Sequence, residues 1–207
     1  MATTRLSTTL WWMSQPVDHF DYANRDNFSM RVLLNDEHWK STTSPILFYT
    51  GNEANVELYV NATGLMWERA SELGAMLVWA EHRYYGESLP FGANPRPKHD
   101  MGFLTMEQAL ADYANVIYEL KRRRNAPDAP VIALGGSYGG MLSAWMRIKY
   151  PQVIAGAIAA SAPVRALDGM AAAKYAPFDG AAYWAVVTRD ASPAAGAHPR
   201  CVPGVKA

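Results

Sequence analysis

The chain has 207 residues, of which 50% are hydrophobic and 18% are charged, and this is long enough for one sizeable α/β core. Because 19 basic residues balance 19 acidic ones, the sequence offers no electrostatic case for binding nucleic acid or an anionic membrane surface. It contains no run of about 18 apolar residues, so no membrane span is expected. No sequence pattern calls for a metal ion or an organic cofactor.

Three sequence features bear on whether the chain enters the secretory pathway: its N-terminal segment, its single cysteine and one glycosylation triplet. The apolar patch at 10–13 is shorter than the core of about 7–15 residues that a signal peptide needs, so no signal peptide is predicted. The single Cys201 cannot form an internal disulfide. Asn61-Ala62-Thr63 would accept a glycan if the chain entered the secretory route, although such triplets also arise by chance.

The first third of the chain predicts strands. Residues 15–20 and 28–34 are expected to form two strands around a polar turn at 21–27, as an antiparallel entry to a sheet. Residues 45–49 form a short, continuously apolar run that is typical of a strand covered on both faces. This strand ends in a loop at 50–53.

A helix and a strand follow, and then a long loop. Helical spacing over 65–73 stops at Gly74, which is a suitable C-terminal glycine. The next strand, 75–80, runs into the polar stretch 81–88 and then into a loop rich in Pro and Gly that continues through Asp100.

A long helix is predicted after this loop. Thr105 and Gln108 form a capping box, in which the threonine hydroxyl accepts from the amide of residue 108 and the glutamine reaches back. Apolar residues then recur at helical spacing up to the basic run 121–124. Four cations at a helix C-terminus complement the macrodipole, and we favour this interpretation over a binding patch.

The apolar strand at 131–134 runs directly into Gly-x-Ser-x-Gly around Ser137, and a helical pattern follows at once. This is the setting of a nucleophile elbow, in which a strained turn projects the serine hydroxyl above the sheet edge. The backbone N–H of Tyr138 would then face a developing oxyanion, with the positive end of the helix behind it. Neighbouring positions must lack side chains that clash, and glycine stands at 135, 136, 139 and 140.

The helix after the elbow is expected to run to Tyr150, where Pro151 ends it, and residues 156–161 predict a further buried strand. Strand and helix therefore alternate, which indicates a mainly parallel, doubly wound sheet. Beyond Ala162 the pattern weakens, and 191–207 has no periodicity, so no structure is assigned there.

A serine hydroxyl needs a neighbouring base, and the elbow alone does not provide one. In this fold the order along the chain is Ser, then Asp or Glu, then His. The only histidine after Ser137 is His198, which lies outside any strand-and-loop unit and is not expected to be the base. The acids after Ser137 include Asp168, Asp179 and Asp190. The earlier histidines, His82 among them, would imitate a triad order that belongs to a β-barrel, so His82 is interpreted as a structural loop residue.

An oxyanion site also needs a second amide, which in this fold comes from the loop after the third strand. Gly51 permits a close approach there, so the backbone N–H of Asn52 or Glu53 is the candidate. The alternative is a simple strand-to-loop turn in which Asn52 satisfies its own backbone.

Four stretches resemble the serine peptidase family that includes lysosomal Pro-Xaa carboxypeptidase, dipeptidyl peptidase II and the thymus-specific serine protease. They occur in the family's order between Gln15 and about Val164, and the third is far more specific than the elbow itself. The stretches are QPVDHF (15–20), YTGNE (49–53), EHRYYGES (81–88) and GGSYGGML (135–142).

The resemblance implies an α/β-hydrolase fold, cut short before the helical cap and the final strands. Residues 15–164 would be the N-terminal part of the hydrolase domain, and 165–207 the start of the cap or an irregular tail. Ser137 matches the family nucleophile and Tyr138 the oxyanion residue after it. The family's Asp and His lie beyond the cap, so they are assigned to no residue here, and the isolated chain is expected to be nearly inactive.

By resemblance, the function is that of a serine exopeptidase that cleaves peptides next to proline, in a lysosomal or secreted setting. The alternatives are an esterase or lipase on the same fold and a non-catalytic, truncated interaction protein. The expected partner is a peptide with proline near one terminus, and the family also allows a homodimer of the full-length protein. Carboxypeptidase and aminodipeptidase stay open, since Glu53, Glu81 and Glu87 could bind an amine and Arg83 a carboxylate, or all could pair among themselves.

Overall fold

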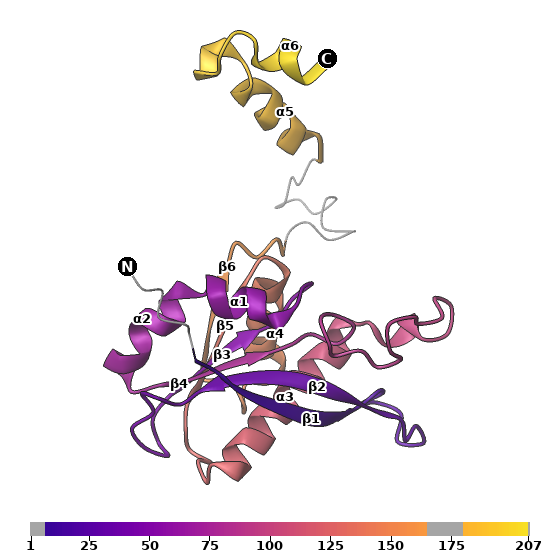
Figure 1. Ribbon diagram of the computed structural model, residues 1–207, viewed down its shortest axis with the longest axis vertical. Coiled ribbons are helices and arrows are strands. Elements are labelled where there is room, and N and C mark those ends of the chain that lie inside the picture. Colours follow the sequence, from indigo (N-terminus) through magenta and orange to yellow (C-terminus); the bar gives the residue numbers. More distant parts are fainter. Residues whose placement is uncertain (1–6, 165–179, 207) are drawn as a thin grey trace. The chain divides into compact units, whose positions relative to one another are not determined.

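A computed structural model describes residues 7–164 and 180–206 of the chain (Figure 1). The chain falls into two compact units, Met1–Ala162 and Pro163–Ala207. The first unit contains a six-stranded sheet, and the second contains short helices.

The sheet has the strand order β1-β2-β4-β3-β5-β6. β1 pairs antiparallel with β2, and β2 pairs antiparallel with β4, whereas β4, β3, β5 and β6 are parallel. The predicted mainly parallel sheet is therefore confirmed. The strands are β1 (Thr9–Pro16), β2 (Asn27–Asn35), β3 (Ile46–Thr50), β4 (Met76–Ala80), β5 (Val131–Gly136) and β6 (Gly156–Ala160).

Helices cover both faces of this sheet (Figure 1). Because side chains alternate along a strand, Phe48 and Val78 pack into one buried cluster with α3 and α4, while Leu77 and Trp79 pack into a second cluster with α1 and α2. The sheet is thus doubly wound, as predicted. The helices of this unit are α1 (Val56–Ala62), α2 (Gly64–Leu73), the 3₁₀ turn η1 (Met101–Phe103), α3 (Met106–Arg123) and α4 (Tyr138–Lys149).

The prediction for the first strand was wrong. The strand is Thr9–Pro16 rather than 15–20, because its hairpin pairs Thr9 with Leu34 and Pro16 with Asn27. After Val17 the backbone turns away, and the Asp18 carboxylate accepts from the amide of Phe20. Asp and Asn side chains favour turns of this kind, and here the turn overrides the apolar alternation.

The prediction that residues 156–161 form a buried strand was also wrong in one respect. The strand exists as β6, but four of its five residues are exposed, and Ile158 keeps 47% of its surface accessible. Within the described residues β6 pairs only with β5, so its outer edge has no neighbour. Burial depends on what lies beyond a strand, and the strand's own composition does not report it.

The helix before β4, α2, and the helix after the elbow, α4, agree with prediction, whereas the short helix α1 was not predicted. At α3 the Thr105 hydroxyl accepts from the amide of Gln108, as a capping residue should. The Gln108 side chain does not reach back, because it bonds Asp18 and the amide of His19 instead. The predicted capping box is therefore only half formed.

The basic end of α3 is paired on the surface. Arg122 and Arg123 both bond Glu119 one turn earlier, and these bonds hold the pKa of Glu119 down at about 2. These pairs favour a solvated helix end over a binding patch, as the sequence interpretation did.

The short helices of the second unit are α5 (Gly180–Asp190), the 3₁₀ turn η2 (Pro193–Ala195) and α6 (Cys201–Lys206). The expectation of no structure over 191–207 was therefore wrong for η2 and α6. In the part of the chain that the structure describes, no helix combines the length and apolar character needed to cross a membrane.

Candidate active site

Three loops meet at one edge of the sheet. The parallel strands β3, β4 and β5 are neighbours, with Thr50 opposite Ala80 and Tyr49 opposite Leu134. Their carboxyl ends therefore lie together, and so do the loops that follow them. These loops begin at Gly51, Glu81 and Ser137.

Ser137 has the backbone conformation of a nucleophile elbow. Its φ is 55° and its ψ is −125°, a strained region for a residue with a side chain. Its N–H donates to the carbonyl of Ala160 at 3.0 Å, which fixes the turn against β6. The residue is exposed, and its hydroxyl has no hydrogen-bond partner within the described residues. The hydroxyl is therefore free to meet a substrate.

Close backbone packing makes this turn possible. A Cβ at Gly135 would lie 2.1 Å from the carbonyl oxygen of Gly139, and one at Gly139 would lie 2.7 Å from that of Thr50. Only glycine fits at these two positions. Gly136 differs, because a Cβ there would come no nearer than 3.9 Å to the Tyr49 hydroxyl. Packing against the surroundings does not require glycine at 136, contrary to the sequence interpretation.

The loop after β3 is bonded directly to the elbow. The Thr50 hydroxyl donates to the carbonyl of Gly139 at 2.7 Å, and the Asn52 side-chain amide donates to that of Gly136 at 3.3 Å. The backbone N–H groups of Asn52 and Glu53 donate no hydrogen bond within the described residues. Two unpaired amides thus lie on the segment that holds the elbow.

The loop after β4 opens with Glu81, His82 and Arg83, and all three are completely buried. The Glu81 carboxylate pairs with Arg31 at 2.6 Å and accepts from the first amide of α1, at Val56, and from the hydroxyl of Ser88. Gly86 packs against this carboxylate, with no room for a Cβ. Glu81 therefore joins β2, α1 and the end of its own loop.

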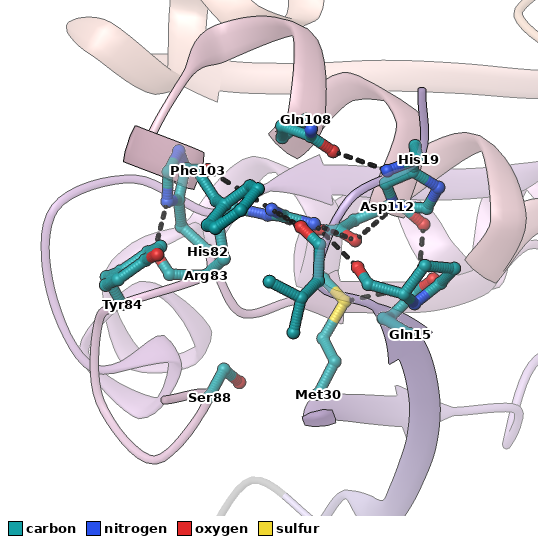
Figure 2. A network of polar contacts seen from close by, with 12 residues as sticks. Gln15, His19, Met30, His82, Arg83, Tyr84, Ser88, Phe103, Gln108 and Asp112 are labelled. Carbon is teal, nitrogen blue, oxygen red and sulfur yellow. Dashed lines mark hydrogen bonds and ion pairs between the residues drawn. The ribbon is translucent and has the colours of Figure 1, made fainter. Parts of the chain in front are cut away.

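Arg83 joins the same loop to α3 and to the end of β1. Figure 2 shows its guanidinium beside Asp112, with His19 on the other side of that carboxylate. Arg83 forms two bonds with Asp112, at 2.7 and 2.9 Å, and His19 Nε2 lies 2.7 Å from Asp112 Oδ1. Arg83 also donates to the carbonyl of Val17 at 2.8 Å. Such a bidentate, fully buried pair fixes the loop strongly.

His82 stands between Glu81 and Arg83 in the sequence, and its side chain reaches the elbow. Its Nδ1 is 2.7 Å from the carbonyl of Arg83, and its Nε2 is 3.0 Å from the hydroxyl of Tyr138. A carbonyl can only accept, so Nδ1 carries the proton and Nε2 accepts from Tyr138. Burial lowers the pKa of His82 and raises that of Tyr138, so both side chains are neutral near pH 7.

Comparison with known proteins assigns the chain to a family. A model of the family described as serine carboxypeptidase S28 matches residues 15–197. The chain belongs to the serine carboxypeptidase S28 family. The family resemblance stated from sequence is therefore confirmed.

Named relatives agree with this assignment. The chain is 54% identical over 161 residues to lysosomal Pro-X carboxypeptidase of Mus musculus and 55% identical over 155 residues to that of Homo sapiens, covering 77% and 74% of this chain but 33% and 31% of those proteins. It is 36% identical over 157 residues to the human thymus-specific serine protease, covering 75% of this chain and 30% of that protein. The chain thus spans about a third of the length of these relatives.

A solved structure supports the fold. An alpha-beta serine hydrolase homologue from Coxiella burnetii superposes with a TM-score of 0.51 at 18% identity, covering 79% of this chain and 67% of that chain. The α/β-hydrolase fold predicted for this S28 chain is confirmed.

The structure brings some predicted site residues of the S28 chain together and separates others. The candidates Ser137, Tyr138, Asn52 and Glu53 share the edge where the three loops meet. Glu81 and Arg83 belong to one of the three loops, but each is buried in an ion pair and is out of reach of a substrate. Of the carboxylates proposed as amine partners, Glu87 pairs with Arg31, whereas Glu53 is exposed with no hydrogen bond or ion pair in the described part of the chain.

The other candidates lie elsewhere. Asn61 is exposed on α1 and donates its side-chain amide to the carbonyl of Glu57. His198 belongs to the second unit, where it accepts from the amide of Arg200, and its exclusion as the base stays a prediction. Asp168 and Asp179 lie outside the described residues, and Asp190 pairs with Arg189. No group of three metal-ligating side chains occurs within residues 7–164 and 180–206.

Sequence reasoning missed the contact of His82 with Tyr138. It placed His82 in a structural loop and did not connect it to the elbow. The available signal was positional, because a charged run directly after an apolar parallel strand must begin at the edge where the other loops meet.

Proposed function

We propose that Ser137 is the nucleophile of a serine exopeptidase that cleaves peptides next to proline. The observation that carries this proposal is the strained backbone of Ser137, which presents at the carboxyl edge of the sheet a hydroxyl with no hydrogen-bond partner among the described residues. Strain of this kind persists only where surrounding packing enforces it, and it concentrates at active sites. The preference for proline rests on the names of the relatives, lysosomal Pro-X carboxypeptidases.

The proposed chemistry begins with attack of the Ser137 oxygen on the scissile carbonyl. Negative charge then develops on the carbonyl oxygen, which the N–H of Tyr138 and that of Asn52 or Glu53 would bind. Tyr138 is the first residue of α4, so its N–H has no intrahelical acceptor and the helix dipole adds to its effect. Each such donor contributes roughly 10²–10³ in turnover in enzymes of this kind.

The base must be a group other than the histidines of the first unit that are already bonded. His82 uses both ring nitrogens, and His19 is bonded to Asp112. In the family that the sequence resembles, the triad Asp and His follow the cap, and on that ground we propose that they come from outside the described residues. The 207-residue chain alone is then expected to turn over negligibly, because losing the base can cost about a million-fold.

The cellular setting is part of the same proposal. We infer a lysosomal or secreted protein, with a glycan on Asn61, which is exposed on α1. Removal of N-glycans should shift the mass of the native protein, and Asn61→Gln should abolish the shift that this site contributes. An unmodified Asn61 in protein from its natural source would contradict this part.

Activity can be tested with three substrates and one probe. In the longest protein that the gene encodes, a fluorophosphonate should label Ser137. At least one of two proline peptides should be cleaved: an N-blocked peptide with a free carboxylate after proline, or an Xaa-Pro arylamide with a free amine. Ser137→Ala should abolish both labelling and cleavage.

Other outcomes separate the alternatives. Hydrolysis of a p-nitrophenyl ester with neither proline peptide cleaved would indicate an esterase. Absence of labelling and of all hydrolysis would contradict catalysis and would fit an interaction protein. Ordinary turnover by the isolated 207-residue chain would contradict the proposed origin of the base.

A further inference from the structure

We propose that His82 is a positioning residue that holds the oxyanion amide of Tyr138 in place by accepting a hydrogen bond from the Tyr138 side chain. This inference rests on the proposed role of Ser137 and deepens it. It assigns to the loop after β4 a direct part in the geometry of the elbow.

The backbone of Tyr138 belongs to the elbow, and its side chain bonds the buried loop after β4. It directly follows Ser137 and opens α4, where the first N–H groups of a helix lack intrahelical acceptors. The orientation of its amide is therefore set by the turn and by whatever holds its side chain. That side chain turns back to the loop after β4, where its hydroxyl donates to His82 Nε2 at 3.0 Å.

His82 is a rigid acceptor for this bond. Its ring is completely buried, in edge contact with Tyr85 at 5.3 Å and Tyr113 at 6.4 Å between ring centroids. The Nδ1 proton bonds the carbonyl of Arg83, which fixes the tautomer and directs the Nε2 lone pair at Tyr138. The ring can neither rotate nor exchange roles without breaking a buried bond.

The support of His82 continues to the helix behind it. Arg83 carries the carbonyl that orients His82, and it is itself held by two bonds to Asp112 on α3 (Figure 2). A continuous path of short bonds thus runs from α3 through Arg83 and His82 to Tyr138. A small displacement at the end of such a path matters, because misplacement by about 1 Å can cost roughly a hundredfold in rate.

The first experiment measures the surroundings of the Tyr138 amide and does not depend on catalytic activity. Ser137-Tyr138 is the single Ser-Tyr pair in the 207 residues, so ¹³C-carbonyl serine with ¹⁵N-tyrosine labelling gives one amide resonance for Tyr138. We expect His82→Phe to move this resonance and His82→Gln, which restores an acceptor, to return it close to its original place. An unmoved resonance in a folded His82→Phe chain would overturn the proposal.

The second experiment measures catalysis and labelling at Ser137 in the longest protein that the gene encodes. His82→Phe and Tyr138→Phe should each lower kcat and the rate of fluorophosphonate labelling by roughly 10- to 100-fold, with KM changed less than about twofold. The double variant should be no slower than the slower single variant, because both changes remove one bond. His38→Gln, a histidine outside this cluster, serves as the control and should keep the original rate.

The outcomes are distinguishable from failure of the proposed function. If the unchanged protein is not labelled at Ser137, the proposed function fails, and the Tyr138 resonance still decides the role of His82. If labelling occurs and both variants match it while their thermal transitions are lowered, His82 is only a structural residue and the inference is wrong.

Discussion

The elbow at Ser137 and the loop that begins at Glu81 meet at one edge of the sheet, yet they are held in opposite ways. The elbow is fixed by backbone approach, with Gly135 and Gly139 packed so closely that no side chain fits. The loop is fixed by buried charge, with Glu81 paired to Arg31 and Arg83 to Asp112.

Because the two regions are held differently, each is expected to be sensitive to a different kind of substitution. The elbow should be sensitive to added volume, even of one methyl group, and indifferent to charge. The loop should be sensitive to loss of a single charged partner, because the remaining charge would be buried without compensation. Substitutions in both regions test this contrast, beginning with the largest expected effect.

The largest effect is expected from Arg83→Met. This change leaves the fully buried Asp112 without its main partner and should lower the free energy of unfolding by about 3–5 kcal/mol, measured by urea denaturation. Arg83→Met combined with Asp112→Leu should recover part of the loss, because no unpaired carboxylate remains.

A surface arginine provides the control for that experiment. Arg122→Met removes a pair with Glu119 on the exposed side of α3 and should change stability little. If Arg83→Met were no more destabilising than Arg122→Met, buried charge would not be what fixes the loop.

The elbow should respond to volume instead. Gly135→Ala places a methyl group 2.1 Å from the carbonyl oxygen of Gly139 and should cost about 1–3 kcal/mol of stability, together with most of the labelling at Ser137. Gly136→Ala is the matched control, because its methyl group has open space and should change stability by less than about 0.5 kcal/mol. Equal effects of the two alanines would contradict an elbow held by close packing.

The smallest effect concerns pH and His82. Burial holds the pKa of His82 below its ordinary value of 6.5, so the unfolded chain binds this proton more readily than the folded one. Stability from this residue is therefore present above about pH 6.5 and is lost as the pH falls below it, by at most about 1.4 kcal/mol per pH unit. Charged and titratable groups that act on His82 include Arg83, Asp112, Glu53, Tyr85, Tyr113 and Tyr138.

His82→Phe removes this proton site and should flatten the dependence of unfolding free energy on pH below about pH 6.5. Denaturation curves at several pH values would measure the two slopes. Parallel slopes for the two proteins would show that His82 does not resist protonation in the fold.

Much of this architecture could be predicted from sequence because its signals are local. The elbow, the strand before it, the helix after it and the alternation of strand and helix all follow from runs of adjacent residues. Three of the four family stretches also coincide with the loops that meet at Ser137. Local pattern was thus sufficient for the mainly parallel order of the sheet and for the position of the elbow, whereas the role of Ser137 as a nucleophile stays a prediction.

The features that the sequence did not predict depend on contacts between segments that lie far apart in the chain. The exposure of β6 depends on what lies beside it, and the pairing of Glu81 with Arg31 joins residues fifty positions apart. The role of Gln108 changed because Asp18 and His19 lie next to it in space. His82 was interpreted as structural for the same reason, since nothing near it in sequence indicates Tyr138. No periodicity or motif carries such information.

We propose that Ser137 is an activated nucleophile, and the residue to which a fluorophosphonate attaches reports on this role. In the longest protein that the gene encodes, the probe should attach to Ser137 alone, and Ser137→Ala should abolish its attachment. Attachment to a different residue, or no attachment to the natively folded protein, would contradict the claim.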